Sequence, residues 1–286
     1  MAAVTIKAVN LPVRLCAIDI DGTLLNSQFQ ISPADREALQ QAHARGVEIV
    51  LVTGRRHTFA LPIAQQLGFD ICLISSNGAV TKSLAGELFY RELLQAEAVR
   101  KLCDAMGDFR RNMVVTFDRE ERGALVVEGL DGFTGSISGW MQKNAAYIAH
   151  VSPIEQCLTC DPIQAMYCGP VAQMREAAAR LVGSAVAKEV TMLRTEYVRR
   201  DLAILDVLKA GCTKGSAVAR WARHRGISRD QVMAIGDNYN DLEMLAFAAY
   251  PVIMGNACDE LKQSGWQVTA SNDENGVAAA LSAVLP

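Results

Sequence analysis

Short apolar runs without alternating polar residues recur along the first part of the chain, and each run ends in polar residues. The runs cover residues 15–18, 47–52 and 71–74. Uninterrupted runs of this length are typical of strands that are buried on both faces of a parallel sheet. Between them, Ser32-Pro33 predicts a capped helix start, Gly46 predicts the end of that helix, and residues 60–67 predict a short second helix. This strand–helix–strand–helix–strand order begins a doubly wound sheet.

The same pattern returns in the last part of the chain. Apolar runs near 232–235, 251–254 and 266–268 predict strands, and Thr213 predicts the cap of a helix from Lys214 to Arg225. From about residue 80 to 208 the pattern differs, because helical runs alternate with short strand-like pieces. We therefore predict an α/β fold with a doubly wound, Rossmann-like parallel-sheet core and an inserted α+β cap domain. The expected core takes residues 1–83 and 208–286, and the expected cap takes residues 84–207.

Four polar clusters follow the predicted strands or begin a predicted helix. They are Asp19 with Asp21, Thr53-Gly54-Arg55, Lys214, and Gly236-Asp237 with Asn240-Asp241. Asp21-Gly22 alone could be an ordinary turn, but Asp19 extends a buried strand, where an acid has no structural use. The carboxyl ends of parallel strands share one edge of a sheet, so the clusters can converge on one crevice. Carboxylates with a lysine and a small hydroxyl are typical of a Mg²⁺ site that handles phosphate.

The clusters resemble the four motifs of the haloacid dehalogenase-like superfamily, in the same order along the chain. These motifs are Asp-x-Asp-Gly-Thr, a strand that ends in Thr-Gly-Arg, a downstream lysine, and Gly-Asp-x-x-Asn-Asp. The position of the cap, and Asn77 in Ser-Asn-Gly-Ala after the third strand, resemble the Cof-type branch. The resemblance implies a Mg²⁺-dependent phosphatase of small phosphorylated metabolites. It also implies that Asp21 gives the metal its backbone carbonyl, that Thr53 hydrogen-bonds the phosphoryl oxygens, and that Asp241 lies at the metal.

The chemistry of phosphate transfer assigns functions to these residues. A carboxylate that attacks a phosphate meets a repulsion of about 4 kcal/mol for charges ~4 Å apart at an effective dielectric of about 20. Mg²⁺ held by Asp19 and Asp237, together with Lys214, would offset this repulsion. We therefore expect Asp19 to be the nucleophile that forms an aspartyl-phosphate, and Asp21 to exchange protons with the leaving group and with water. Two structural alternatives are that Lys214 is solvated in the first turn of its helix and that Asp241 is a helix cap.

The residues that would contact the substrate are less well defined. Gly54, Arg55, Asn77 and Asn240 are the candidates near the phosphate. Arg55 could reach the substrate or pair with an acid, and Asn77 could serve a left-handed turn. We interpret His57 as structural. In the cap, where specificity is expected, the candidate residues are Arg119, Arg122, Trp140, Tyr147 and Tyr167, and the expected substrate is a small sugar phosphate.

The composition of the chain argues against several classes of protein. With 286 residues and half of them apolar, the chain is long enough for two domains with separate cores. A net charge of −3, with arginine pairs scattered along the chain, argues against a nucleic-acid partner. Runs of transmembrane length and a signal-peptide pattern are both absent from the sequence, so we expect a cytoplasmic protein without a membrane partner. Cys157 and Cys160 have no second metal-binding pair at finger spacing, so we expect reduced, structural cysteines, and no obligate protein partner is indicated.

Three other functions share parts of this pattern. A phosphomutase or phosphotransferase would use the same aspartyl-phosphate and pass it to another acceptor, and the sequence hardly separates it from a phosphatase. A dehalogenase would need neither Asp21 nor the metal cluster, so both count against it. A non-catalytic phosphometabolite-binding protein is expected to lack the nucleophile or the acid, and this chain has both.

Overall fold

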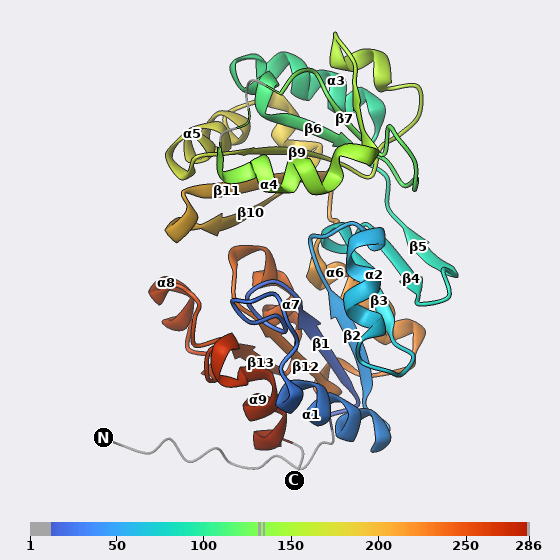
Figure 1. Ribbon diagram of the computed structural model, residues 1–286, viewed down its shortest axis with the longest axis vertical. Helices are drawn as coiled ribbons and strands as arrows, with labels where there is room; N and C mark the ends of the chain where they lie inside the picture. Colours follow the sequence, from blue (N-terminus) through green and yellow to red (C-terminus); the bar gives the residue numbers. More distant parts are fainter. Residues whose placement is uncertain (1–12, 131–132, 134, 285–286) are drawn as a thin grey trace.

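Two β-sheets, one above the other in Figure 1, organise the chain. This computed structural model describes residues 13–130, 133 and 135–284. The larger sheet has the strand order β14-β13-β12-β1-β2-β3-β4-β5. Its strands are β1 (Leu15–Asp19), β2 (Glu48–Val52), β3 (Cys72–Ser75), β4 (Val80–Ser83), β5 (Leu88–Arg91), β12 (Val232–Gly236), β13 (Tyr250–Ile253) and β14 (Gln267–Val268). All neighbouring pairs from β14 to β3 are parallel, which confirms the predicted core.

Helices cover both faces of this sheet, which explains the uninterrupted apolar runs. They are α1 (Pro33–Ala44), α2 (His57–Gln65), α6 (Lys214–His224), α7 (Leu242–Phe247), α8 (Asp259–Lys262) and α9 (Gly276–Val284). In β1, Cys16 and Ile18 pack in one cluster with residues of α1, α2 and α9. The alternate residues Leu15 and Ala17 pack in a second cluster with α6, α7 and α8. Each face of the strand therefore needs an apolar side chain.

The predicted helix starts have the expected caps. The Ser32 side chain accepts a hydrogen bond from the backbone N–H of Asp35, and Pro33 is in the first turn of α1. Thr213 and Ser216 form a reciprocal capping box at the start of α6. This box begins the helix at Lys214, so the lysine side chain projects from the first turn of α6.

The core sheet continues beyond residue 83, where the sequence analysis expected the first core segment to end. Strands β4 and β5 extend it through two antiparallel pairings, as far as Arg91. The reversal after β3 uses Ser76, Asn77 and Gly78, which have φ values of 49°, 53° and 103°. Because this turn folds the chain straight back onto β3, a strand-like piece that looked like the start of the cap becomes part of the core.

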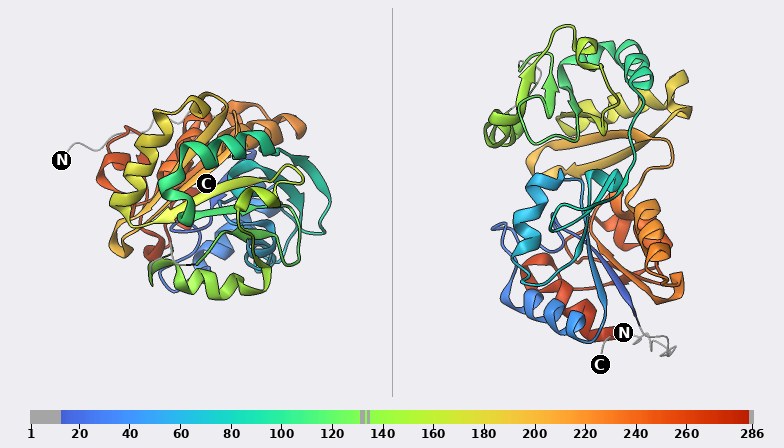
Figure 2. Two further views of the ribbon diagram at one scale, coloured as in Figure 1. Left: turned by 90° about the horizontal axis from the view of Figure 1, so that it is seen from above. Right: turned by 90° about the vertical axis from the view of Figure 1, so that its right-hand side faces the viewer.

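The cap is a six-stranded sheet with helices, inserted between β5 and α6. Its strand order is β10-β11-β9-β6-β7-β8. The strands are β6 (Met113–Thr116), β7 (Leu125–Val127), β8 (Ile148–His150), β9 (Gln164–Gly169), β10 (Val190–Tyr197) and β11 (Leu202–Lys209), and the α-helices are α3 (Ala96–Ala105), α4 (Gly135–Asn144) and α5 (Val171–Val182). In Figure 2 the cap stands above the core, with the hairpin of β10 and β11 nearest to it.

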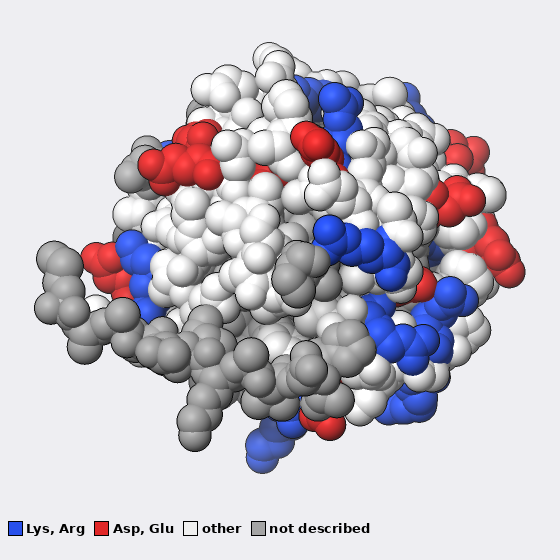
Figure 3. Space-filling view, turned by 90° about the horizontal axis from the view of Figure 1, so that it is seen from below, with Lys and Arg blue, Asp and Glu red and all other residues white. Residues whose placement is uncertain are grey.

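The face of the core that lies away from the cap carries charged side chains of both signs. Seen from below, on the side away from the cap, basic and acidic side chains lie among each other around the rim (Figure 3). This face shows no broad field of one sign among the described residues. Within the same part of the chain, every helix is too short or too polar to cross a bilayer.

Candidate active site

The polar clusters from the sequence meet at the carboxyl end of the core sheet, beneath the cap. Asp19 ends β1, Thr53 follows β2, Asp237 follows β12, and Lys214 begins α6. Above them lies a cavity of about 550 Å³ between core and cap, lined by residues of both, including Asp19, Asp21 and Thr53. The parallel topology therefore brings together residues that are up to about 220 positions apart in the chain.

Lys214 is the centre of a buried charge cluster. Its side chain is 1% exposed. Its Nζ donates hydrogen bonds to Asp19 Oδ1 at 2.5 Å and to Asp241 Oδ1 at 2.6 Å. The alternative of a solvated lysine is therefore wrong. A buried ammonium between two carboxylates is held firmly, because each partner would otherwise be an uncompensated buried charge.

Asp241 is both a cap and a member of the charge cluster. Its Oδ2 accepts hydrogen bonds from the backbone N–H groups of Asp237 and Asn238, both at 3.0 Å. Its Oδ1 accepts the hydrogen bond from Lys214. The capping interpretation of Asp241 is thus correct for one oxygen and incomplete for the other.

The cluster holds three carboxyl groups, those of Asp19, Asp237 and Asp241, around one ammonium group. Burial raises the pKa of Asp19 to about 7, although Lys214 opposes this rise. Burial and the neighbouring carboxylates of Asp19 and Asp241 raise the pKa of Asp237 well above its usual range. Burial opposes the charge on Lys214, but Asp19 and Asp241 more than compensate and hold its pKa above the ordinary value. With Asp19, Asp237 and Asp241 ionised, three carboxylates would face one ammonium.

This donor set fits a divalent cation. Asp19, Asp237 and Asp241 can each offer a carboxylate oxygen, and these oxygens lie within 4.8 Å of one another. Hard oxygen ligands with excess negative charge are the environment that Mg²⁺ prefers. The Asp237 carboxylate is also oriented, since its Oδ1 accepts a hydrogen bond from Thr23 Oγ1 at 3.0 Å. The side chain of Asp21 is outside this set, and the metal contact of its backbone carbonyl stays a prediction.

Two glycines allow the carboxylates to come this close. Gly22 has φ +85°, and a Cβ there would lie 2.4 Å from Asp237 Oδ2. A Cβ on Gly236 would lie 2.7 Å from Asp241 Cγ. A side chain at either position would displace an acid of the cluster, and at Gly22 it would also strain the backbone.

Asp21 has a different environment from Asp19. Arg55 clamps its carboxylate with two hydrogen bonds, Nε to Oδ2 at 2.7 Å and Nη2 to Oδ1 at 2.5 Å. The sequence left open whether Arg55 reaches the substrate or pairs with an acid, and in the structure it pairs with Asp21. The bidentate hydrogen bonds from the guanidinium fix the position of the Asp21 carboxylate.

The remaining candidates near the phosphate form a hydrogen-bonded chain. Asn240 Nδ2 donates to Asn77 Oδ1 at 2.9 Å, and Asn77 Nδ2 donates to Asp206 Oδ2 at 2.8 Å. Gly54 lies against the same amide, because a Cβ there would be 3.2 Å from it. The hydroxyl of Thr53 accepts a hydrogen bond from the backbone N–H of Arg55. Whether these residues bind substrate stays a prediction.

Sequence reasoning missed Asp206, although a signal was present. It interrupts the apolar run of β11, where an acid is as unexpected as Asp19 is at the end of β1. The candidate specificity residues of the cap lie in different places. Trp140 lines the cavity, whereas Tyr167 is completely buried inside the cap. Tyr147 stacks on Arg56, which donates a hydrogen bond to the carbonyl of Arg119 at 2.8 Å.

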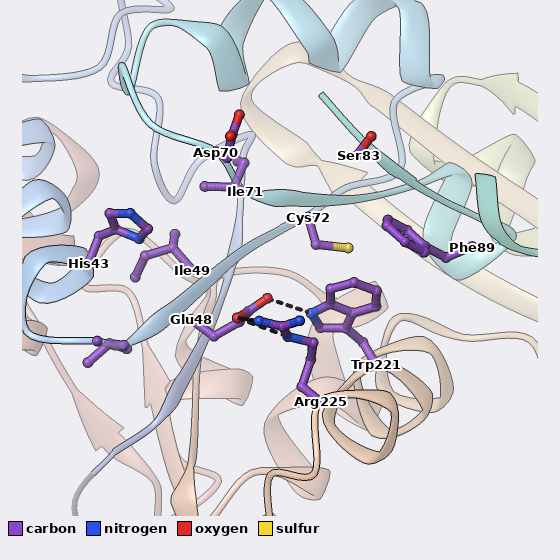
Figure 4. Close-up of a pocket in the computed structure, with 12 residues that line it drawn as sticks. His43, Glu48, Ile49, Asp70, Ile71, Cys72, Ser83, Phe89, Trp221 and Arg225 are labelled. Atoms are coloured by element: carbon purple, nitrogen blue, oxygen red, sulfur yellow. Dashed lines mark hydrogen bonds and ion pairs between the residues drawn. The ribbon is translucent and has the colours of Figure 1, made fainter. Parts of the chain in front are cut away.

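A second hollow, of about 320 Å³, lies at the opposite edge of the core sheet (Figure 4). Two of its charged groups, Glu48 and Arg225, are paired with each other, because Glu48 accepts hydrogen bonds from Trp221 Nε1 and Arg225 Nε, each at 3.2 Å. Its walls include Cys72, whose thiol pKa burial raises well above the ordinary value. The cavity beneath the cap is therefore the candidate active site.

The motifs, the cap and this geometry agree with a comparison against known families. The family described as haloacid dehalogenase-like hydrolase matches residues 16–281. The chain belongs to this family. The resemblance found in the sequence is thereby confirmed, and so is the predicted fold class.

Relatives of known name cover nearly the whole chain. Phosphatase YwpJ of Bacillus subtilis is 30% identical, over 93% of this chain and 98% of its own. Pyridoxal phosphate phosphatase YbhA of Escherichia coli is 27% identical, over 93% of this chain and 96% of its own. A haloacid dehalogenase-like hydrolase from Bacteroides thetaiotaomicron, of solved structure, is 26% identical with a TM-score of 0.76, over 95% of this chain and 99% of its own. Family membership makes the chain a hydrolase, and these names support phosphoric monoesters as its substrates.

Proposed function

We propose that the chain is a Mg²⁺-dependent phosphatase that hydrolyses a small phosphorylated metabolite through an aspartyl-phosphate on Asp19. The observation that carries this proposal is the buried cluster in which Lys214 joins Asp19 to Asp241 beside Asp237. Such a cluster is costly for the fold unless it is used, because buried carboxylates lose their hydration. The phosphatase names of YwpJ and YbhA support the same reaction.

Asp19 has the surroundings that a nucleophile needs. Lys214 holds its Oδ1, so Oδ2 is the oxygen that attacks phosphorus. The new Asp19–phosphorus bond forms as the bond from phosphorus to the ester oxygen breaks. Mg²⁺ bound by Asp19, Asp237 and Asp241 would neutralise charge on the phosphoryl group in this step. Water then attacks the aspartyl-phosphate and releases inorganic phosphate, which restores the Asp19 carboxylate.

Asp21 moves the protons in both halves of the reaction. It protonates the departing alkoxide, and it later takes a proton from the attacking water. Arg55 holds the Asp21 carboxylate through two hydrogen bonds. For the first half Asp21 must carry a proton, so Arg55 has to turn away when substrate arrives. We infer that the substrate phosphate draws Arg55 from Asp21, which makes Arg55 both a restraint and a substrate contact.

The size of the cavity suits a sugar phosphate or a phosphorylated ring compound. Its volume of about 550 Å³ is within the range for small-molecule sites. Aromatic side chains from core and cap line it, namely Phe29, Phe59, Trp140 and Tyr197. The relative YbhA is named for pyridoxal phosphate, a ring compound. We therefore propose that the panel of substrates should include rings as well as the sugar phosphates expected from the sequence.

The test is release of inorganic phosphate from such a panel, with Mg²⁺ and with EDTA. We expect turnover that EDTA abolishes and that Asp19→Asn lowers by about a thousandfold or more. Asp70→Asn, which changes an exposed aspartate outside the cavity, is the matched control. Undiminished turnover in EDTA or in Asp19→Asn contradicts the mechanism. Phosphate that is passed to a second sugar, with none released, would instead indicate a phosphotransferase.

A further inference from the structure

The hydrogen-bonded chain that starts at Asn240 continues into the cap and ends on a free acceptor. Asp206 accepts from Asn77 through Oδ2 at 2.8 Å and from Gln164 Nε2 through Oδ1 at 3.1 Å. Asp206 is in β11 and Gln164 begins β9, the neighbouring strand of the cap sheet. Among the described residues, Gln164 Oε1 has no hydrogen-bond partner although it is buried. A buried acceptor without a partner is costly, so its presence calls for an explanation.

The orientation of the Gln164 amide follows from chemistry. Gln164 Nε2 faces Asp206 Oδ1 at 3.1 Å, and when Asp206 is ionised its carboxylate can only accept hydrogen bonds, so the NH₂ group is then the side of Gln164 that must face it. The carbonyl oxygen must then point the other way. Asp206 is held in turn by a hydrogen bond from Asn77. This row of hydrogen bonds therefore determines that Oε1 is the atom of the Gln164 amide without a partner among the described residues. The unpaired acceptor is therefore a built feature of the cap.

Gln164 and Asp206 both line the cavity that contains Asp19. They are 4% and 5% exposed, so both belong to its inner wall. Two other polar residues of the cap wall, Thr116 and Thr195, are also buried there. This polar part of the wall is connected through Asn77 to the loop that carries the phosphate-handling residues. A ligand whose phosphate lies at Asp19 would extend from that loop toward the cap.

The backbone conformation at Asn77 indicates that the row of hydrogen bonds from Asn240 to Gln164 serves a function. Ser76 and Asn77 both have left-handed φ values, 49° and 53°, and neither is glycine. Two consecutive residues in this region cost free energy that the rest of the structure must compensate. The conformation directs Asn77 between Asn240 of the core and Asp206 of the cap. Strain of this kind is found where a side chain must be held in one place.

We propose that Gln164, oriented by Asp206, is a specificity residue that accepts a hydrogen bond from a hydroxyl or amino group on the body of the substrate. This inference rests on the proposed function, because it assigns the non-phosphate end of the same ligand. The ligand class is a phosphate monoester with a hydrogen-bond donor on its carbon skeleton. A site with a buried acceptor discriminates strongly against an analogue without the donor, because that analogue leaves the acceptor unpaired.

The first experiment measures the hydrolysis of a set of substrates, with Mg²⁺, by the natural protein and by two variants. The probes are ribose 5-phosphate, glucose 6-phosphate, glucosamine 6-phosphate and pyridoxal 5′-phosphate, each with hydroxyl or amino donors, and p-nitrophenyl phosphate, which has none. We expect Gln164→Met to lower the ratio of kcat/KM for the best donor-bearing substrate to that for p-nitrophenyl phosphate by about tenfold or more. The matched control, Gln156→Met, changes an exposed cap glutamine outside the cavity and should leave the ratio unchanged.

A binding experiment separates this inference from the proposed function. In Asp19→Asn, which cannot form the aspartyl-phosphate, calorimetry gives Kd for the same compounds and for inorganic phosphate without any turnover. We expect Gln164→Met in this background to weaken the best donor-bearing ligand about tenfold relative to inorganic phosphate. Equal losses for all ligands, or no loss, would overturn the inference, whichever result the hydrolysis assay gives. Failure of hydrolysis alone would overturn only the proposed function.

Asp206→Asn tests the orientation itself. The new amide can accept from Asn77, but its NH₂ group then needs an acceptor, and Gln164 can supply one only by turning its carbonyl inward. The Gln164 NH₂ group would then take the place of Oε1, so this position would donate instead of accept. We expect the preference for donor-bearing substrates to fall about tenfold, as in Gln164→Met, and the double variant to show no additional loss. A preference that persists in Asp206→Asn would show that Asp206 does not orient Gln164.

Discussion

The core and the cap present two different surfaces to the same cavity. The core side is a set of charges in mutual contact, with Lys214 buried between Asp19 and Asp241. The cap side combines aromatic rings, amides and hydroxyls with Asp206 and Lys143, and among the described residues its buried acceptor Gln164 Oε1 has no partner. The difference indicates a division of work. The core is complete without the body of the substrate and provides the reaction, whereas the cap wall is completed by the ligand and provides recognition.

We expect the largest effect where a charge of the core wall is removed. Lys214→Met leaves Asp19 and Asp241 without their cation, so we expect a loss of about 3–5 kcal/mol in the free energy of unfolding at pH 8. Turnover should also fall by a thousandfold or more, since Lys214 offsets the charge of the attacking carboxylate. Chemical denaturation and phosphate release measure the two effects.

Lys143→Met is the matched control from the other wall. Lys143 lies along the same cavity but is exposed on the cap, near the ring of Phe29. Its replacement should change the free energy of unfolding by no more than about 0.5 kcal/mol. Equal stability losses in both variants would remove the distinction between the two walls.

The residues of the core wall could be predicted from the sequence more fully than those of the cap wall, for a physical reason. The core residues stand directly after buried strands, so the topology of a parallel sheet alone brings Asp19, Thr53 and Asp237 together. Their spacing in the sequence was therefore sufficient to place them in one crevice. The Asp21–Arg55 pair could be named only as one of two possibilities, because side-chain pairing depends on rotamers that the sequence does not specify.

The cap wall could not be predicted in the same way. Its polar residues come from β6, β9, β10 and β11, whose order in the sheet does not follow the chain. Asp206 and Gln164 meet only because β11 and β9 are antiparallel neighbours. Strand β5, which lies beyond the expected end of the first core segment at residue 83, was assigned to the cap for a related reason. The strained turn at Ser76 and Asn77 reverses the chain, and the pattern of apolar residues does not predict this turn.

The second prediction concerns Asp206, which joins the two walls. Burial raises its pKa to about 7, against the effects of Asn77, Lys214 and Gln164. The folded protein therefore binds this proton more tightly than the unfolded chain, so stability falls as pH rises from about 4 to about 7. Asn cannot ionise, so we expect the stability of Asp206→Asn relative to the natural protein to increase across this range. The increase should reach at most about 4 kcal/mol.

Denaturation in EDTA at pH 4.5 to 8, for both proteins, measures this difference. EDTA keeps metal binding at Asp19 and Asp237 from changing with pH, and the other titrating groups of the cluster are common to both proteins. Asp108→Asn, on the exposed outside of the cap, is expected to give a nearly flat difference curve. A flat curve for Asp206→Asn would mean that this carboxylate is not buried between core and cap.

Apart from the control variants, Gly22→Ala is expected to have the smallest effect on stability, because it disturbs the core wall without removing a charge. Gly22 and Gly46 have nearly equal φ values, +85° and +87°, so alanine strains the backbone at both by about 1 kcal/mol. Only at Gly22 does a Cβ meet the Asp237 carboxylate, whereas the space at Gly46 is open. We therefore expect Gly22→Ala to lower kcat by about a hundredfold through displacement of Asp237, and Gly46→Ala to leave it unchanged. Because the two strains are matched, equal kcat values in the two variants would show that the position of Asp237 does not limit the reaction.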